Sequence, residues 1–274
     1  MEILIILDSE SYHHPPVLMG RIIAQAAAGS VDVLIVVPKG GHPENGPAVA
    51  EQAAQDLGEI QPRIMIEKGD PGKEIEAVLE DDDYQLIIVN ADRILRLRNT
   101  VEVNPKLIKQ SEISLLIAQN PKPKLDRILL CTSCKDLDYS LIQQAAGLAS
   151  HLSASVTMLH VCAGAVPSMY TGLDQIDETV EELLQTDTSY AQHLRRGVEI
   201  LQENRIESEI KIRRGIPIEE IIRETQIENY DLVVIGSTDV NRGLKERLLG
   251  NLVIQIIDRV ELPVLVVGSR DLNS

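Results

Sequence analysis

Residues 3–9 read Ile-Leu-Ile-Ile-Leu-Asp-Ser, and residues 127–133 read Arg-Ile-Leu-Leu-Cys-Thr-Ser. Both are continuous apolar runs that end in polar residues, which is typical of a strand buried on both faces of a parallel sheet. Each is followed by an Ala-rich helical pattern and then by a second apolar run, at 31–37 in the first half and at 155–161 in the second. The two halves therefore open with the same strand-helix-strand unit.

The similarity between the halves continues through a shared turn. Residues 67–71 (Glu-Lys-Gly-Asp-Pro) match residues 213–217 (Arg-Arg-Gly-Ile-Pro), and each stretch ends a third strand at Gly and enters a helix near Pro. Proline is tolerated there because the first helical N–H has no partner to lose. Apolar runs at 84–89 and 230–235 predict the fourth strands, and each half finishes with a helix and a fifth strand.

This alternation predicts an α/β protein of two tandem Rossmann-like domains, each a five-stranded parallel open sheet with helices on both faces. We place the domains at residues 1–120 and 126–270, hereafter the first and second copies, with a linker at 121–125. The linker reads Pro-Lys-Pro-Lys-Leu, and its prolines predict a short, stiff connection. A length of 274 residues fits two small domains.

Composition and charge argue against several classes of protein. The net charge is −16 and the chain has no Trp and no Phe, so it lacks the basic surface and the stacking rings of a nucleic-acid binder. An anionic membrane surface would repel it, and no apolar run approaches the roughly 20 residues of a membrane span. The N-terminus lacks the basic region of a signal peptide, and the three cysteines form an odd set. We therefore expect a cytoplasmic protein.

Ligands of doubly wound sheets bind at the carboxyl ends of strands, where the winding reverses. In a five-stranded unit of this kind, that point lies between the first and fourth strands. The residues that leave those strands are Asp8-Ser9 and 90–92 in the first copy, and Ser133-Cys134 and 236–239 in the second. We predict any ligand site at these segments.

Only the second copy continues with a glycine-containing loop. Gly236, Gly243 and Gly250 permit close approach of the backbone to a ligand, and the free N–H groups of a helix predicted at 252–260 could hold phosphate oxygens. The alternative is that these glycines serve turns and caps only. The first copy has no glycine between Gly72 and the linker; three arginines (Arg93, Arg96 and Arg98) stand there instead, either as an anion site or, as we favour, as a solvated basic face.

Several stretches of the second copy resemble the universal stress protein family. Residues 153–161 (Ser-Ala-Ser-Val-Thr-Met-Leu-His-Val) look like its second strand and residues 231–236 (Asp-Leu-Val-Val-Ile-Gly) like its fourth. Residues 243–251 and 262–267 resemble its signature region and last strand. The resemblance covers the first copy more faintly, and it implies a tandem member with an adenine nucleotide alpha hydrolase-like fold. Because family members pair through their last strands, it also implies an intramolecular pseudo-dimer in which Leu115–Ala118 pairs with Val264–Val267.

The resemblance further implies a site for ATP or AMP, with Mg accompanying the nucleotide. Many members bind ATP through a pattern Gly-x-x-Gly-x9-Gly-Ser/Thr. Gly236 matches its first glycine, but Asp239 replaces the second, ten residues instead of nine precede Gly250, and Asn251 replaces the hydroxyl residue. The family's aspartate after the first strand is present as Asp8 in the first copy but is Ser133 in the second. The contacts implied for the second copy are Ser133, Val161, Gly236, Ser237, Gly243, Gly250, Asn251 and Leu252, with Asp8 as a weaker counterpart in the first.

Two other motifs have competing interpretations. Cys131 and Cys134 form a Cys-x-x-Cys, and His160 and Cys162 on the next strand would complete a zinc or redox set. We favour the simpler interpretation of Cys131 as a buried small hydrophobe in a strand. Residues 13–16 (His-His-Pro-Pro) could contact a metal or a phosphate, although a surface turn stiffened by proline is the simpler interpretation.

No nucleophile or catalytic base can be named, so we do not expect an enzyme beyond very slow ATP hydrolysis. Two functions remain open. The first is a regulatory protein that binds ATP or AMP in its second copy and acts through a protein partner in stress response. The second is a nucleotide-free interaction module in which both sites have decayed. Two tandem chains could also form a homodimer, and the sequence identifies neither the protein partner nor the stress signal.

Overall fold

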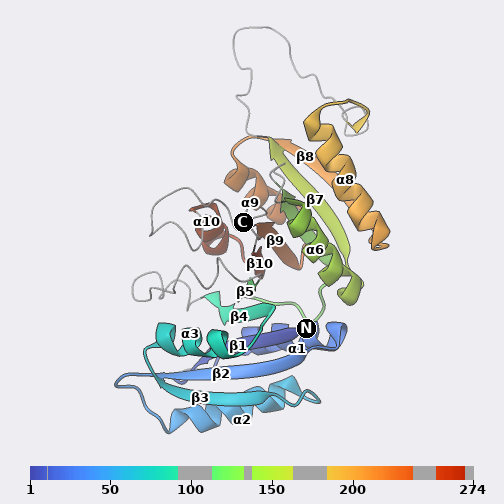
Figure 1. Cartoon of the computed structure of the whole chain (residues 1–274). Helices are drawn as coiled ribbons and strands as arrows, with labels where there is room; N and C mark the ends of the chain where they lie inside the picture. Colours follow the sequence, from blue (N-terminus) through green and yellow to red (C-terminus); the bar gives the residue numbers. More distant parts are fainter. Residues whose placement is uncertain (11, 92–112, 133–137, 163–183, 237–250, 269–274) are drawn as a thin grey trace.

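The computed structural model describes residues 1–10, 12–91, 113–132, 138–162, 184–236 and 251–268 (Figure 1). The strands of the first copy are β1 (Glu2–Asp8), β2 (Ser30–Pro38), β3 (Arg63–Gly69), β4 (Leu86–Asn90) and β5 (Ser114–Ala118). Those of the second copy are β6 (Arg127–Thr132), β7 (Ser155–Cys162), β8 (Ser208–Arg214), β9 (Leu232–Gly236) and β10 (Val264–Val267). The helices are α1 (His14–Ala27), α2 (Asn45–Leu57), α3 (Pro71–Asp81), α6 (Asp138–Leu152), α8 (Ser189–Glu203), α9 (Pro217–Ile227) and α10 (Asn251–Arg259).

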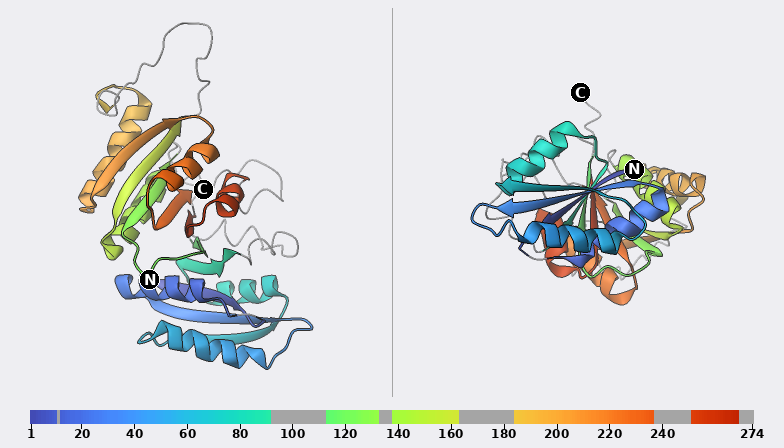
Figure 2. Two further views of the ribbon diagram at one scale, coloured as in Figure 1. Left: turned by 180° about the vertical axis from the view of Figure 1, so that it is seen from behind. Right: turned by 90° about the horizontal axis from the view of Figure 1, so that it is seen from below.

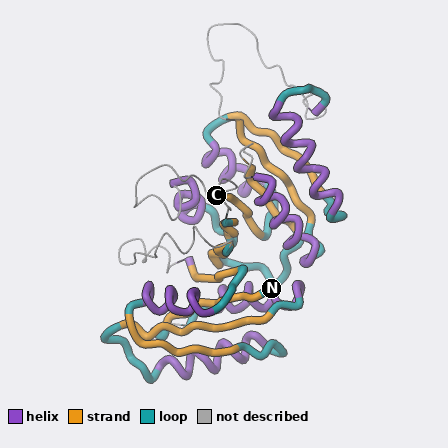
Figure 3. Tube along the Cα trace, in the orientation of Figure 1, coloured by secondary structure: helices purple, strands orange, loops and turns teal. Residues whose placement is uncertain are grey.

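The ten strands among the described residues form one sheet in the order β3-β2-β1-β4-β5-β10-β9-β6-β7-β8. Within each copy every neighbouring pair is parallel, as the continuous apolar runs predict. Figure 3 shows the strands of each copy lying between helices, and in Figure 2 the strands fan out as expected of a twisted sheet. The predicted fold class is therefore confirmed.

The copies meet where β5 and β10 pair antiparallel. Leu116 pairs with Leu265, and the pairs on either side are Ile117 with Val264 and Leu115 with Val266. Leu116 and Leu265 occupy equivalent positions in their copies, because each lies beside the middle residue of the preceding strand, Ile88 or Val234. The pseudo-two-fold axis thus passes through this pair, and the predicted pseudo-dimer through the last strands is confirmed.

The apolar core is continuous across this junction on both faces of the sheet. On one face, α1, α2, α6 and α8 cover a cluster that includes Leu116 and Leu265, and α1 contacts α6 directly. On the other face, α3, α9 and α10 cover a second cluster that includes Ile117 and Val264. Because neither copy has a core of its own at the junction, we expect the two copies to unfold together.

Two groups of element boundaries differ from the sequence predictions. The fourth strands begin at Leu86 and Leu232, two residues later than predicted, because Tyr84 and Tyr230 precede them as buried side chains whose hydroxyl groups bond to carboxylates. The helix expected before β5, and most of the insertion at 163–185, lie outside the described residues. No helix in the described part of the chain combines the length and the apolar character needed to cross a membrane.

Candidate functional site at the carboxyl ends of β6 and β9

The winding of the second copy reverses between β6 and β9. These strands are neighbours, with Cys131 beside Ile235, so the last residues of both strands, Thr132 and Gly236, reach the same edge of the sheet. The helix that follows β6, α6, covers one face of the sheet. The helices that precede and follow β9 along the chain, α9 and α10, cover the other face. In doubly wound sheets, ligands bind outside the carboxyl ends of the strands at such a point.

Gly236 stands at the end of β9, facing α6. A Cβ placed on Gly236 would lie 3.5 Å from Cδ2 of Leu141, an ordinary van der Waals distance, so the fold itself does not demand glycine there. Its counterpart in the first copy is Asn90, the last residue of β4. The sequence difference between the copies thus falls on the strand end that borders the predicted crevice.

Two buried polar side chains, one on β6 and one on the neighbouring β7, lie on the α6 face of the sheet. Thr132 Oγ1 and His160 Nδ1 are 3.3 Å apart, and both residues are buried. Nearby elements contribute a second pair, in which the ring of Tyr139 on α6 stacks on that of His193 on α8 with centroids 4.8 Å apart. The contacts predicted from the sequence leave out Thr132, and they include His160 only as a possible zinc ligand.

A signal for these residues exists in the repeat itself. By strand register, the counterparts of Thr132 and His160 in the first copy are Leu7 and Ile35, both fully apolar and buried. Burying a polar pair where the other copy buries an apolar pair costs free energy, so apolar packing alone does not explain the polar pair. Aligning the two copies residue by residue would have identified it.

Asp8 ends β1 in the first copy, at the position equivalent to Ser133. Its Oδ1 accepts a hydrogen bond from the backbone N–H of Glu10 at 2.8 Å, so one carboxylate oxygen holds the loop that follows the strand. The next residue, Ser9, is buried. The structure therefore gives Asp8 a local role in the loop, independent of any ligand.

The two histidines after β1, His13 and His14, lie at the start of α1. The helix begins at His14, with proline in its first turn, as expected of a residue type that needs no N–H partner there. His14 Nδ1 lies 2.9 Å from Oδ2 of Asp56, which also accepts from the hydroxyl of Tyr12. These contacts tie the loop to α2 and support the interpretation of this stretch as a structural turn.

The zinc hypothesis fails on the placement of Cys131 and His160. Cys131 packs against the cluster covered by α9 and α10, whereas His160 contacts Thr132 on the α6 face, so the two side chains lie on opposite faces of the sheet. Burial raises the pKa of the Cys131 thiol, and the nearby Glu224 carboxylate adds to this effect. Within the described ranges, no group of three or more His, Cys, Asp or Glu side chains could hold a metal ion. Cys131 is thus a partly buried member of the apolar cluster and cannot share a metal ion with His160.

The described residues include only part of the predicted nucleotide contacts. Val161, on β7, packs against the α9–α10 face, and Asn251 and Leu252 begin α10, although their side chains are not described. Ser133, Ser237, Gly243 and Gly250 lie outside the described residues, as do Cys134 and the three arginines of the first copy. The set of contacts as a whole remains a prediction.

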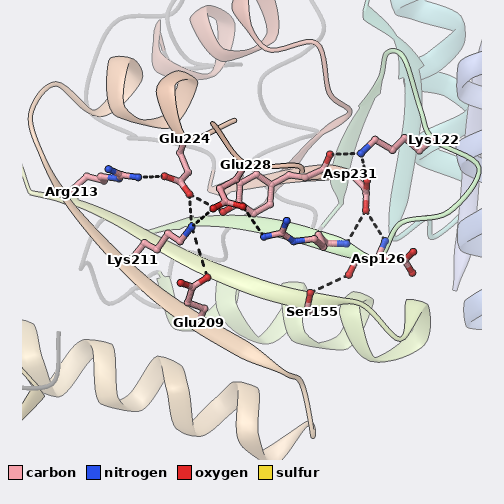
Figure 4. Close-up of polar contacts among 11 residues, drawn as sticks. Lys122, Asp126, Ser155, Glu209, Lys211, Arg213, Glu224, Glu228 and Asp231 are labelled. Carbon is pink, nitrogen blue, oxygen red and sulfur yellow. Dashed lines mark hydrogen bonds and ion pairs between the residues drawn. The ribbon is translucent and has the colours of Figure 1, made fainter. Parts of the chain in front are cut away.

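A network of charged side chains occupies the opposite, amino-terminal side of β6 and β9 and extends over β8 (Figure 4). Asp231 accepts from Lys122 Nζ of the linker at 2.6 Å and from the backbone N–H groups of Asp126 and Arg127, each at 2.9 Å. Arg127 in turn lies 3.3 Å from Glu228 and over the ring of Tyr230. These contacts fix the linker to the second copy, far from the ligand edge.

The same network contains a fully buried carboxylate. Glu224 on α9 is 0% exposed; its Oε1 accepts from Lys211 Nζ and from the Tyr230 hydroxyl, both at 2.9 Å, and Arg213 contacts Oε2. Burial raises the pKa of Glu224, but the hydrogen bonds from Lys211, Arg213 and Tyr230 outweigh it and leave the pKa below its usual range. Asp231 follows the same pattern: the bonds from Lys122 and two backbone amides outweigh desolvation and lower its pKa.

These lowered pKa values predict loss of stability in acid. A carboxyl whose folded-state pKa lies below its unfolded value stabilises fully above the unfolded value, near 4 for Asp and Glu, and loses that contribution as the pH falls through the folded pKa. We expect the free energy of unfolding, measured by urea titration, to decline between about pH 5 and pH 2. Asp231→Asn should flatten this decline, and an unchanged pH slope in that variant would contradict the assignment.

Comparison with known proteins links the second copy to a family. The model of the "Universal stress protein family" matches residues 124–268. A universal stress protein of Methanocaldococcus jannaschii is 25% identical to this chain over 151 residues. The alignment covers 55% of this chain and 86% of the relative's length. A universal stress protein structure from Archaeoglobus fulgidus aligns with 98% of this chain and 97% of its own, at a TM-score of 0.66 and 17% identity. The structure of a candidate universal stress protein from Pseudomonas aeruginosa aligns with 98% of this chain over 94% of its own length, with a TM-score of 0.68 and 19% sequence identity.

Proposed function

The chain belongs to the universal stress protein family, and from this premise we propose that it is a regulatory protein whose second copy binds ATP or AMP and whose signal passes to a protein partner. The family match covers the second copy, where the glycine-containing loop lies. The first copy then serves mainly as its fused structural partner. A stress-response role and the identity of the partner are parts of this proposal.

One observation carries the proposal. Gly236 ends β9 at the edge where the winding reverses, although the packing around it would accept a Cβ. A glycine that packing does not require is explained if a ligand must approach the backbone at that point. The first copy, which lacks the loop glycines, has Asn90 at the same position.

The chemistry of the surrounding residues fits a nucleotide. The first turn of α10 presents backbone N–H groups without intrahelical partners, and the partial positive charge of a helix start favours phosphate oxygens. The Thr132 hydroxyl at the end of β6 offers a donor and an acceptor close to the same edge. The Thr132 hydroxyl has His160 Nδ1 as a neighbour at 3.3 Å, but both side chains are buried, so we propose binding with at most very slow ATP hydrolysis.

A nucleotide-free interaction module is the alternative function. It is favoured by Asp239, whose carboxylate would stand where phosphates approach, and by Ser133 in place of the family aspartate. The intramolecular pairing of β5 with β10 would serve such a module equally well. Binding measurements decide between the two functions.

We expect ATP or AMP to stabilise the protein in a thermal-shift titration. A ligand at a hundredfold excess over its Kd adds about 2.7 kcal/mol to the free energy of unfolding, which is several degrees in melting temperature for a chain of this size. Titrations with and without MgCl2 show whether the metal contributes. Absence of a shift at millimolar ATP and AMP would favour the nucleotide-free module.

The variant Gly236→Asn locates the site, because it gives the second copy the residue of the first. Affinity for the nucleotide, measured by isothermal titration calorimetry, should fall about tenfold or more, since a side chain would stand where the backbone meets the ligand. Asn90→Ala is the matched control in the first copy and should leave affinity unchanged. The reverse pattern would place the nucleotide in the first copy.

A further inference from the structure

Gln119 connects the two copies at the end of a helix. It follows β5 in the first copy, yet its side-chain Nε2, with two N–H groups to donate, lies within hydrogen-bond distance of three backbone carbonyls of the second. The acceptors are the carbonyl of Ile257 at 3.4 Å, that of Val260 at 2.5 Å and that of Leu262 at 2.9 Å. All three belong to the last turn of α10 or to the segment that leads from it to β10.

These carbonyls need a donor from outside the helix. The last carbonyls of an α-helix have no intrahelical partner, and a half-buried carbonyl without a donor is costly. The apolar face of α10, formed by Val253, Ile256 and Ile257, is buried against the sheet and α9, which resists sideways movement of the helix. The Gln119 amide adds directional bonds that fix the helix along its axis.

The anchor is asymmetric between the copies. By the register of β5 and β10, the counterpart of Gln119 is Gly268, which has no side chain to donate. The carbonyl of Gly268 instead lies 3.4 Å from Nε2 of Gln144 on α6, which also contacts Ser114 of β5. The first copy can therefore hold a helix of the second through this position, whereas the second cannot return the same contact.

We propose that Gln119 is a positioning residue for the nucleotide site of the second copy, an inference that rests on the proposed function. The ends of α10 serve two different tasks: Asn251 at its start lies in the predicted phosphate contact, and Val260 beyond its other end meets Gln119. A nine-residue helix is about 13 Å long and moves as one body. A bond that fixes one end therefore sets the position of the N–H groups at the other. The first copy, although its own loop has lost the glycines, completes the ligand site of the second.

The test uses the full-length chain with three variants. Gln119→Leu removes the donor at nearly constant volume, and Gln119→Lys restores donors to the same carbonyls with a charge that suits a helix C-terminus. Gln144→Leu is the matched control, because it makes the same substitution at the junction between the copies without touching α10. Two quantities are measured: hydrogen exchange of the α10 backbone amides, and ATP affinity by calorimetry at a temperature where every variant is folded.

Gln119→Leu should speed exchange in α10 about tenfold and weaken ATP binding by a similar factor, while Gln119→Lys recovers most of both. Gln144→Leu should leave α10 exchange and ATP affinity at wild-type levels. Normal ATP affinity in Gln119→Leu, or an equal loss in Gln144→Leu, would overturn the positioning role alone. Wild-type protein that binds neither ATP nor AMP would overturn the proposed function, and this role with it.

Discussion

Replacing Glu224 by valine should lower the free energy of unfolding by about 3 kcal/mol, because it leaves two cations facing a buried site without their carboxylate. Lys211 and Arg213 both contact Glu224, and the Tyr230 hydroxyl would lose its acceptor as well. We place the effect at the lower end of the range for broken buried ion pairs, because the Lys211 and Arg213 side chains are 19% and 30% exposed. Urea unfolding monitored by circular dichroism measures it.

The residues at the equivalent positions of the first copy suggest a control variant for Glu224→Val. The counterparts of Glu224 and Lys211 there are Val78 and Met65, and both pack against the apolar cluster on the same face. The double variant Lys211→Met, Glu224→Val should therefore be more stable than Glu224→Val alone, since apolar replacement of a buried ion pair is often neutral. A strongly favourable coupling in this double-mutant cycle is the expected result. Equal stability of Glu224→Val and the exposed variant Glu219→Gln would contradict the role of the network.

Truncation of Leu116 to alanine should cost roughly 2–5 kcal/mol, the range for a fully buried leucine, and should destabilise both copies at once. Leu116 is 0% exposed, pairs with Leu265 across the pseudo-two-fold axis and belongs to the cluster shared by the two copies. Hydrogen exchange followed by mass spectrometry should show the amides of β1 and of β6 losing protection together. Leu265→Ala should behave alike, and the two effects should not add because the side chains are neighbours.

Ile227→Ala is the control for this series, because Ile227 is apolar but 58% exposed. Its effect should stay within about 0.5 kcal/mol. If Leu116→Ala destabilised the first copy while the second kept its protection, the copies would be independent domains. That outcome would contradict the shared core.

The sequence predicted the architecture because strong local patterns determine it. Two sets of continuous apolar runs, each separated by helical patterns, allow few arrangements other than two parallel sheets. The pairing of β5 with β10 needed more than these patterns, since a strand such as residues 115–118 gives no sign of its antiparallel partner. The resemblance to a family supplied that pairing, and the register then confirmed it.

The side-chain networks could not be predicted from the sequence, for physical reasons. Lys211 and Arg213 alternate along β8 as they would on a solvated edge strand, and Glu224 resembles the other acidic residues of α9 until it is found to be fully buried. Gln119 bonds to residues about 140 positions away, a separation at which no local pattern gives information. The Thr132–His160 pair shows that the repeat itself carried a signal, which appears once the copies are compared position by position.

The linker that joins the two copies covalently has a consequence for how this molecule responds to dilution and to sequence change. Two separate subunits would part as their concentration fell, whereas the linker keeps these halves at a fixed, high effective concentration. In a symmetric dimer every substitution also appears twice and faces its own copy across the axis. Here each side of the axis carries its own residue, as Gln119 and Gly268 illustrate. One half can thus carry a supporting residue that the other half lacks.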